Sequence, residues 1–495
     1  MRSISVEKVA AAIGAQLHLA AGAHRSDPVG PDVCRDSREV TPGALFVAFP
    51  GEKVDGHDYI PVARRAGASA AIAMRVVDPE MTTLVVTDPT AALGRLARLV
   101  VDNAPALTVI GITGSSGKTS TKDLMAHVLE SVGSTVSPVG SQNNELGVPL
   151  TATRVDDDTR FLISEMGARG AGHIHYLCEL TPPRIGVVLN VGSAHLGEFG
   201  SVEGIAEAKG ELIAALPADG WAVLNHDDPR VAAMADRRAE GVRLAWTAVG
   251  ERPGTVDAGA DDPAGLRVWA EELGIDPDGS SRFTLHSDDG NNHETHPVHL
   301  RLVGRHQVDN AVSAAAVGIL AGLPPSMVAS ALSSARPRSP WRMEVHTRAD
   351  DVLILNDAYN ANPDSMAAAL DSTHELARHR PGTRVWAVLG DMLELGADTD
   401  HAHEEIGRQV AGLGFHQLVA VGQNAEAMCR GARQAGKAEG LEAIADPADV
   451  AGWLAPRIRP GDTVVVKASR GLALERVAEA LASESDTSEP NGGAW

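Results

Sequence analysis

The chain has 495 residues and a formal net charge of −22, which argues against sequence-independent binding to nucleic acid or to anionic membranes. At this length we expect about three domains, each able to bury its own core. The three cysteines are far apart and lack metal-type spacing, so a reducing cytoplasm suits the chain.

Residues 1–106 are expected to form a small α/β domain. Residues 1–18 are predicted to contain an amphipathic helix and lack the long apolar segment of a signal peptide. Residues 44–49 (ALFVAF) and 84–86 are strand-like, and residues 64–74 suggest a helix that runs into a strand. Nowhere does an apolar run approach the ~20 residues that a membrane-spanning helix needs. We therefore expect a cytoplasmic protein with no membrane insertion.

The phosphate-binding chemistry is predicted from residues 107–129 (LTVIGITGSSGKTSTKDLMAHVL). A short strand-like run precedes a Gly-rich turn, and apolar residues then recur at helical spacing. In this setting backbone N–H groups and a helix N-terminus can meet phosphate oxygens. Lys118 is expected to reach the outer phosphates, and the hydroxyl of Thr119 to bind magnesium. Ile112 stands where the standard pattern has its first glycine, so the loop is a shortened variant; a plain strand-to-helix turn is the alternative.

A central domain, residues 107–338, is expected to carry polar side chains at the ends of its strands. Glu165 follows the strand-like residues 161–163, and His195 follows the strand-like residues 185–191. Ligands bind beyond the carboxyl ends of parallel strands, so both side chains fall where a nucleotide and its metal ion would lie. For Glu165 the alternative is a cap or a solvated group.

Lys209 lies within the apolar stripe of a helix predicted over residues 202–216. Seven of the 43 basic residues are lysine, so a retained lysine weakly indicates that an amine matters. A buried lysine is costly unless it is paired or neutral. The pattern leaves two interpretations open. The side chain could reach out to the rim of the helix, or a neutral amine could react with carbon dioxide to form a carbamate, an anionic oxygen ligand for magnesium.

The second half of the chain is expected to end in another doubly wound domain. Residues 235–300 are polar and Gly/Asp-rich, which indicates a peripheral antiparallel addition, and an Ala-rich helix is expected from about residue 304 to Leu320. Residues 339–484 alternate strands and helices, with strands at 352–355, 385–389, 418–421 and 463–466. Asn362, Pro363 and Asp364 have the composition of a helix start. The tail, residues 485–495, is expected to be disordered.

Several motifs, in this order along the chain, resemble those of the Mur ligases, the ATP-dependent amide-forming enzymes of peptidoglycan precursor synthesis. They are TGSSGKTST (113–121), SEMGA (164–168), NVGSAHLG (190–197), EAKGE (207–211) and GRHQVDNAVSAAA (304–316). SQNNELGVPLT (141–151), NDAYNANPDSMAAAL (356–370) and VLGDMLELG (388–396) are most similar to the branch that adds D-alanyl-D-alanine to UDP-N-acetylmuramoyl-tripeptide. The neighbouring branch commonly carries a DNPR-type motif when it uses diaminopimelate, whereas residues 361–364 read ANPD.

The resemblance implies an α/β fold of three domains and a role for each candidate site residue. The domains would be a small N-terminal UDP-substrate-binding domain (1–106), a central P-loop ATPase-like parallel-sheet domain (107–338) and a C-terminal Rossmann-like domain (339–484). ATP would contact Thr113, Gly114, Ser115, Ser116, Gly117, Lys118, Thr119, Asn310, Arg342 and Asp357. Among the substrate-binding residues, Ser37 and Arg38 would meet the UDP part, Asn143, Asn144 and Thr151 would lie along the muramoyl-peptide, and Tyr359, Asn360 and Asn362 would lie near the incoming dipeptide. Mg²⁺ would be held by Thr119, Glu165, His195 and a carbamylated Lys209, and the catalytic residues would be Lys118, His195 and Lys209.

The same resemblance implies a carbon–nitrogen ligase that acts through an acyl phosphate, as a cytoplasmic monomer that binds no nucleic acid. Two alternatives stay open. The irregular phosphate loop would also suit a binding or regulatory protein with a degenerate nucleotide site. A folylpolyglutamate-type or cyanophycin-type ligase would share the ATP-binding half. Substrate trials distinguish these alternatives.

Overall fold

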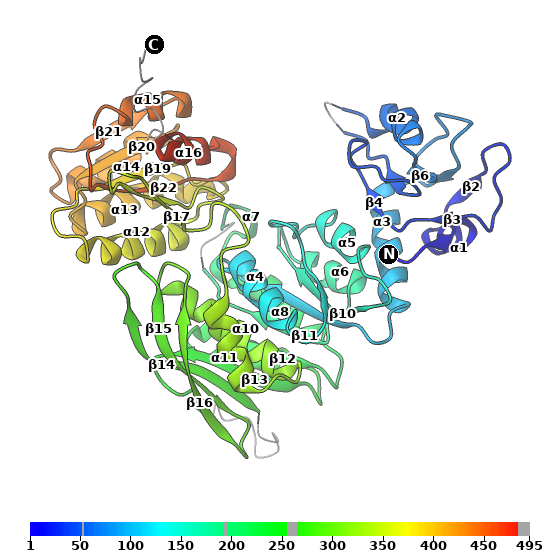
Figure 1. The fold of residues 1–495 in the computed structure, drawn as a ribbon, viewed down its shortest axis with the longest axis horizontal. Coiled ribbons are helices and arrows are strands. Elements are labelled where there is room, and N and C mark those ends of the chain that lie inside the picture. Colours follow the sequence, from blue (N-terminus) through cyan, green and yellow to red (C-terminus); the bar gives the residue numbers. More distant parts are fainter. Residues whose placement is uncertain (52–53, 193–195, 255–264, 484–495) are drawn as a thin grey trace, which may run out of the picture.

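The computed structural model describes residues 1–51, 54–192, 196–254 and 265–483, which form three α/β domains (Figure 1). Their strands make one large sheet in each domain and a small two-stranded sheet at the N-terminus. In the described part of the chain, no helix combines the length and apolar character that crossing a membrane requires. The predicted tail, residues 485–495, lies outside the described residues.

The N-terminal domain is built on a five-stranded sheet in the order β2-β7-β6-β5-β4, in which only β2 and β7 pair antiparallel. The strands are β2 (Gln16–His18), β4 (Val33–Cys34), β5 (Leu45–Val47), β6 (Ala70–Ala73) and β7 (Thr83–Val85), with β1 (Ile4–Ser5) and β3 (Pro28–Val29) forming the small sheet. The helices are α1 (Val6–Ile13), α2 (Ile60–Arg65) and α3 (Pro89–Asp102). The predicted N-terminal helix and both predicted strands are confirmed, although α2 begins and ends earlier than expected.

Helix α3 fastens the N-terminal domain to the central domain. Its buried residues Leu93 and Leu96 share one apolar core with Val109 and Leu162 of the central sheet. Gly94 allows the close approach, since a Cβ at this position would lie 2.9 Å from a methyl carbon of Leu180. The two domains therefore share a continuous packed core.

The central domain contains a nine-stranded sheet in the order β16-β15-β14-β13-β12-β11-β8-β10-β9. Its strands are β8 (Thr108–Thr113), β9 (Ser134–Val136), β10 (Thr159–Glu165), β11 (Ile185–Val188), β12 (Trp221–Asn225), β13 (Arg243–Val249), β14 (Leu266–Ile275), β15 (Ser281–Asp288) and β16 (His293–Leu300). The helices are α4 (Lys118–Leu129), α5 (Gly147–Ala152), α6 (His173–Leu180), α7 (Leu196–Phe199), α8 (Val202–Ala214), α9 (Pro229–Ala232), α10 (His306–Leu320) and α11 (Pro325–Ser334). The predicted strand, loop and helix at 107–129 are confirmed, as is the Ala-rich helix that ends at Leu320.

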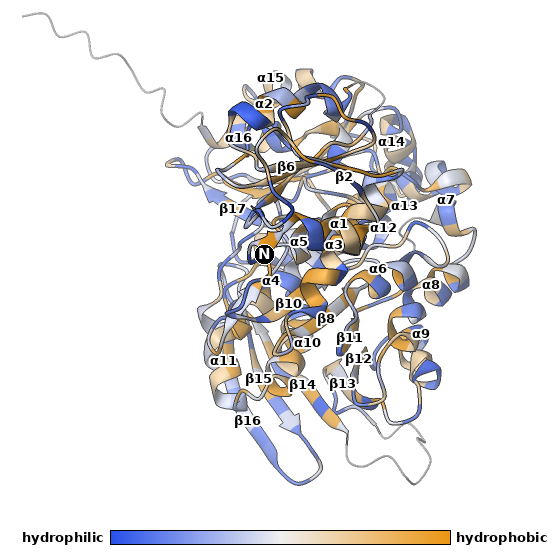
Figure 2. Cartoon of the chain, turned by 90° about the vertical axis from the view of Figure 1, so that its right-hand side faces the viewer, coloured by the Kyte–Doolittle hydropathy of each residue, from blue (hydrophilic) through white to orange (hydrophobic). Residues whose placement is uncertain are grey.

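The expectation of a wholly peripheral addition at residues 235–300 is only partly correct. β13 runs parallel to β12 and belongs to the main sheet. β14 continues it in parallel, and β15 and β16 then extend the same sheet with antiparallel pairing. Figure 2 shows hydrophobic residues on the inner strands and a mostly hydrophilic β16 at the outer edge. The polar composition of the segment reflects an edge that faces solvent on one side.

Two glycines bring helix α8 against the central sheet. A Cβ on Gly111 of β8 would lie 2.8 Å from a methyl carbon of Leu212, and one on Gly186 of β11 would lie 3.2 Å from the Cγ of Leu212. A larger residue at either position would push α8 outward. The close packing holds Lys209, one turn before Leu212, near the carboxyl end of β8.

The C-terminal domain contains a six-stranded sheet in the order β17-β18-β22-β19-β20-β21, parallel except for β17. The strands are β17 (Glu344–Thr347), β18 (Leu353–Asn356), β19 (Val385–Gly390), β20 (Gln417–Val421), β21 (Leu441–Ile444) and β22 (Thr463–Lys467). The helices are α12 (Pro363–Arg378), α13 (Thr399–Gly412), α14 (Ala425–Gln434), α15 (Val450–Leu454) and α16 (Glu475–Ser483). Leu355 and Ile354 belong to separate apolar cores on opposite faces of this sheet, as a doubly wound fold requires.

Candidate functional site

A cavity of about 430 Å³ lies where the phosphate loop meets the C-terminal domain. The central domain lines it with Ser115, Ser116, Gly117, Lys118, Thr119, Ser141, Asn143, Asn144, Glu165, Gly167, Ala168, Arg169, His173 and Lys209. The other wall comprises Arg342, Tyr359, Asn360, Ala361, Asn362, Ser365, Leu393, Glu394, Ser469, Arg470 and Gly471. Most of the predicted ATP, metal and peptide residues are thus brought together, although they come from distant parts of the chain.

The phosphate loop has the geometry of an anion site. β8 ends at Thr113 and α4 begins at Lys118, so the first-turn N–H groups of a 12-residue helix open onto the cavity. Gly117 has φ of 79°, and a Cβ there would lie 2.5 Å from Oδ1 of Asn310. Lys118 turns back to donate a 2.5 Å hydrogen bond to the Gly114 carbonyl. Burial lowers the pKa of Lys118, and the nearby Glu165 carboxylate opposes that shift.

Asn190 braces this loop, a role that the sequence reasoning missed. Its Oδ1 accepts hydrogen bonds from the backbone N–H groups of Ser115 and Ser116, both at 2.9 Å. Its Nδ2 donates to the Ser116 carbonyl at 3.3 Å. The available signal was the position of Asn190 just after β11, the neighbour of β8 in the sheet.

Glu165 has one carboxylate oxygen engaged and one without a partner. Its Oε1 accepts hydrogen bonds from Ser141 Oγ (2.8 Å), Asn143 Nδ2 (3.0 Å) and Thr119 Oγ1 (3.4 Å). Its Oε2 is buried and has no hydrogen-bond partner. A carboxylate oxygen and a threonine hydroxyl at a phosphate loop are the hard oxygen ligands that Mg²⁺ prefers. The donor set therefore fits magnesium, although no cluster of three or more His, Cys, Asp or Glu side chains suited to a metal occurs in the described part of the chain.

Lys209 is buried, with 4% of its surface exposed, and lines the same cavity. This position does not match a side chain that reaches out to solvent at the helix rim. Burial and, secondarily, the charge of Lys118 hold the pKa of Lys209 well below its usual value. A lowered pKa favours the neutral form of the amine, which is the nucleophilic one. The predicted ligand His195 lies outside the described residues.

The C-terminal domain touches the phosphate loop directly. Nη2 of Arg342 donates to Thr119 Oγ1 at 3.1 Å, and its guanidinium lies 4.1 Å from the Tyr359 ring centre. Arg342 Nε is buried without a partner, so it keeps one donor for an anion. Asn362 caps α12, as its sequence context predicted, and its Nδ2 also donates to the Ser115 carbonyl at 3.4 Å.

Five predicted residues of the central and C-terminal domains do not line the cavity. Asn310, Thr113, Thr151 and Asp357 lie in the layer beneath its walls, and Gly114 forms part of the phosphate loop. Asn310 accepts from Thr121 Oγ1 (3.0 Å) and donates to Gln307 (2.9 Å). Thr113 is buried at the end of β8, and Gly114 offers its carbonyl to Lys118. Thr151 is buried in α5 and bonds the Gly147 carbonyl at 2.9 Å. Asp357 binds Lys467 Nζ at 2.6 Å and the Met343 N–H at 3.1 Å.

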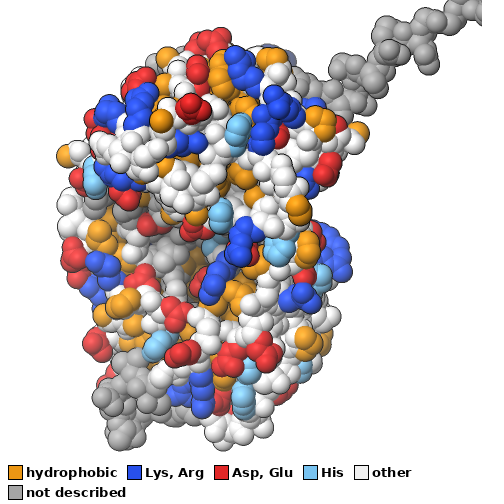
Figure 3. Space-filling model, turned by 90° about the vertical axis from the view of Figure 1, so that its left-hand side faces the viewer, with side chains coloured by type: hydrophobic (Ala, Val, Ile, Leu, Met, Phe, Trp, Pro, Cys, Tyr) orange, Lys and Arg blue, Asp and Glu red, His pale blue; other side chains and the backbone are white. Residues whose placement is uncertain are grey.

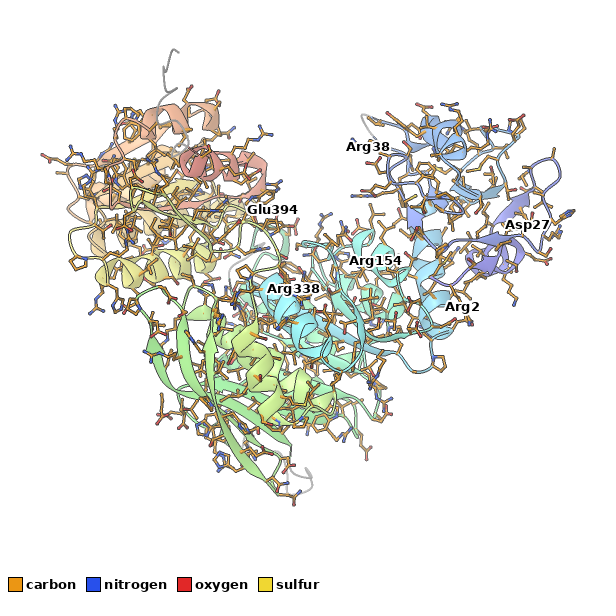
Figure 4. All side chains as sticks on the ribbon, viewed as in Figure 1. Arg2, Asp27, Arg38, Arg154, Arg338 and Glu394 are labelled. Atoms are coloured by element: carbon orange, nitrogen blue, oxygen red, sulfur yellow. The ribbon has the colours of Figure 1, made fainter. Side chains whose placement is uncertain are left out.

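Ser37 and Arg38 do not line this cavity. Arg38 is exposed and forms a two-pronged pair with Asp36, which lowers the pKa of Asp36 to about 2. Figure 4 shows Arg38 on the N-terminal domain and Glu394 on the C-terminal domain. On the face drawn in Figure 3, acidic and basic side chains are interspersed, and no large basic patch is present there.

Comparison with known proteins gives consistent results over the whole chain. Three family models match: "Mur ligase family, catalytic domain" at residues 33–101, "Mur ligase middle domain" at 112–318 and "Mur ligase, glutamate ligase domain" at 341–470. The UDP-N-acetylmuramoyl-tripeptide–D-alanyl-D-alanine ligase of Mycobacterium leprae is 44% identical, over 91% of this chain and 92% of that one. The crystal structure of MurF from Acinetobacter baumannii has a TM-score of 0.83 and 29% identity, over 97% and 99% of the two chains. MurF from Thermotoga maritima, solved in complex with ADP, has a TM-score of 0.74 and 30% identity, over 92% and 98%.

Proposed function

The chain belongs to the Mur ligase family, and we propose that it joins D-alanyl-D-alanine to UDP-N-acetylmuramoyl-tripeptide in peptidoglycan precursor synthesis. The reaction is an ATP-dependent formation of a carbon–nitrogen bond that releases ADP and phosphate. The observation that most strongly supports this proposal is that the phosphate loop, Glu165 and Lys209 share one cavity with Arg342 and residues 359–362. A ligase needs this arrangement because the phosphoryl donor, the acid and the amine must meet at one place.

The reaction has two chemical steps. A carboxylate oxygen of the tripeptide attacks the γ-phosphorus of ATP, the bond to ADP breaks, and an acyl phosphate forms. The dipeptide amine then attacks the acyl carbon, loses a proton, and phosphate leaves from the tetrahedral intermediate. Both steps bring anions together, so fixed positive groups are needed. We infer that Lys118, the first-turn amides of α4 and Arg342 supply them; their place at the cavity and the unpartnered Nε of Arg342 support this role.

Thr119 Oγ1 and Glu165 Oε2 are the groups of this chain that would hold Mg²⁺ in the reaction. When bound, the ion would neutralise part of the charge on the phosphate oxygens. Ser141 and Asn143 hold Oε1 of the same carboxylate and so orient Oε2. We further propose that the Lys209 amine takes up carbon dioxide, with loss of a proton, to become a carbamate; its burial and lowered pKa support this reaction.

The remaining proposals concern the organisation of the chain. Residues 1–106 would bind the UDP part through Ser37 and Arg38, residues 107–338 would bind ATP, and residues 339–484 would bind the dipeptide. The side chains of Tyr359, Asn360 and Asn362 at the cavity wall support the last assignment. A cytoplasmic location is supported by three buried, unbridged cysteines. A monomeric state stays a prediction.

The test is phosphate release from ATP with UDP-N-acetylmuramoyl-tripeptide present, comparing D-alanyl-D-alanine with single amino acids. Release that depends on the dipeptide, with a product of pentapeptide mass, is the expected result. Turnover with a single amino acid would assign the chain to another branch of the ligases. ATP binding without turnover for any acceptor would indicate a degenerate nucleotide site.

A further inference from the structure

Arg470 is a cationic side chain of the cavity wall to which the steps above assign no role. It follows strand β22, and its neighbours in the wall are Leu393, Glu394, Ser469 and Gly471. Half of its side chain is exposed (50%). The guanidinium is therefore accessible to a molecule in the cavity.

Two contacts fix the orientation of this guanidinium. Its central carbon lies 4.2 Å from the ring centre of Trp341. Its Nη1 lies 2.7 Å from Oε1 of Glu475, whose side chain is only 7% exposed. Among the described residues, no side chain or carbonyl accepts a hydrogen bond from Nη2 or Nε of Arg470. A guanidinium that is stacked on a ring and paired on one side still has free N–H donors for a planar anion. Binding such an anion costs little, because the arginine side chain has already lost most of its rotamer freedom.

The other cations of the cavity have different partners. Arg342 donates to Thr119 at the phosphate loop, and Lys118 donates to the carbonyl of Gly114. Lys209 is buried in the central wall, where Arg169 lies 4.0 Å from Glu145. Among the described residues of the C-terminal wall, Arg470 is thus the cation that is not directed at the phosphate loop.

Leu393 gives the same part of the wall an apolar surface. Its side chain is 48% exposed, unusual for a leucine that lines a cavity. Its backbone N–H donates to Ser469 Oγ at 3.0 Å, which fixes the residue beside Arg470. Gly471 leaves room beside it, since a Cβ there would lie 3.5 Å from a methyl carbon of Leu393. A small methyl group could contact Leu393 while a carboxylate next to it meets Arg470.

We propose that Arg470 binds the free carboxylate of D-alanyl-D-alanine and that Leu393 contacts the methyl group of its terminal residue. This inference rests on the proposed function. The dipeptide carries one carboxylate that takes no part in the reaction, at the end opposite to the attacking amine. Anchoring that carboxylate on the C-terminal wall leaves the amine to extend toward the phosphate loop. Arg470 is then a specificity-determining residue that selects an acceptor with a free carboxyl end.

The test compares D-alanyl-D-alanine with D-alanyl-D-alaninamide in wild type, Arg470→Gln and Arg470→Lys. Wild type is expected to show a KM for the amide about 10- to 100-fold above that for the acid, the loss of one charge-assisted hydrogen-bonded pair. Arg470→Gln should raise the KM for the acid by a similar factor, show no preference between acid and amide, and leave the KM values for ATP and the tripeptide within about twofold. Arg470→Lys should retain part of the preference, because it keeps the charge and loses the fork.

Arg457→Gln is the matched control, because Arg457 lies 4.1 Å over Trp453 in the same domain and does not line the cavity. It should behave as wild type with all substrates. The proposal is overturned if Arg470→Gln still distinguishes acid from amide, or if its KM rises for the tripeptide instead of the dipeptide. Failure of the wild type to turn over D-alanyl-D-alanine would refute the proposed function itself, a separate outcome visible before any variant is made.

Discussion

Replacing Lys467 by methionine should destabilise the C-terminal domain about as much as truncating a large residue of its core. Lys467 Nζ lies 2.6 Å from Oδ2 of Asp357, and their side chains are only 2% and 11% exposed. The same ammonium donates to the Asn360 carbonyl at 2.9 Å. Removing it leaves the carboxylate buried and uncompensated, at a cost of about 3–5 kcal/mol. For a domain of this size that corresponds to a fall in Tm of about 10 °C.

The double variant Asp357→Asn/Lys467→Met isolates the charge from the packing. It removes both charges and keeps a side-chain oxygen for the Met343 N–H, so most of the lost stability should return. Thermal unfolding followed by circular dichroism, with and without ADP, measures both effects. If Lys467→Met lowers the Tm no more than the double variant does, the pair does not hold the domain together, and the reasoning from buried charge is wrong.

Four further predictions concern the phosphate site. Lys118→Ala should abolish ATP-dependent phosphate release, and activity within twofold of wild type would remove Lys118 from the mechanism. Glu165→Gln should raise the Mg²⁺ concentration needed for half-maximal turnover by about tenfold or more, because a neutral amide replaces the carboxylate oxygen; an unchanged requirement would place the metal elsewhere. Lys209→Ala should be nearly inactive and partly rescued by short-chain carboxylic acids. In the chain without the carbamate, the lowered pKa of Lys209 means that, as the pH falls, the unfolded chain binds a proton on this amine before the folded chain does. Stability should therefore decrease as the pH falls below the usual lysine pKa, and Lys209→Met should flatten that dependence in urea titrations.

The phosphate loop could be predicted from sequence because its determinants are local. A strand, a short glycine turn and a helix follow one another within residues 107–129, and the structure forms them at Thr108–Thr113 and Lys118–Leu129. Four of the six C-terminal strands, β18, β19, β20 and β22, were predicted to within about one residue for the same reason, whereas β17 and β21 were not predicted. β13 was missed because its place in the main sheet depends on pairing with β12, about 20 residues earlier, and not on its own composition.

Contacts between segments that are far apart in the sequence could not be predicted in this way. Asp357 follows a strand end and suits a nucleotide contact, yet its carboxylate is engaged by Lys467, 110 residues away. Leu393 belongs to the motif at residues 388–396 and Arg470 follows the strand predicted at 463–466, but their shared cavity wall depends on β19 and β22 being neighbours. The role of Asn190 in bracing the phosphate loop could be predicted only with the knowledge that β11 lies beside β8. In each case the residue type was visible and the partner was not.

The linker between the central and C-terminal domains explains why the site needs both. Trp341 and Met343 have φ of 58° and 50°, conformations that cost a non-glycine residue about 1–3 kcal/mol each. Arg342 stands between them and reaches the hydroxyl of Thr119, while Asp357 accepts the N–H of Met343. The strained turn is therefore held by contacts to both domains at once. Arg342 meets the phosphate loop only when the C-terminal domain lies against it, so the position of that domain and the charge around the phosphates are set together.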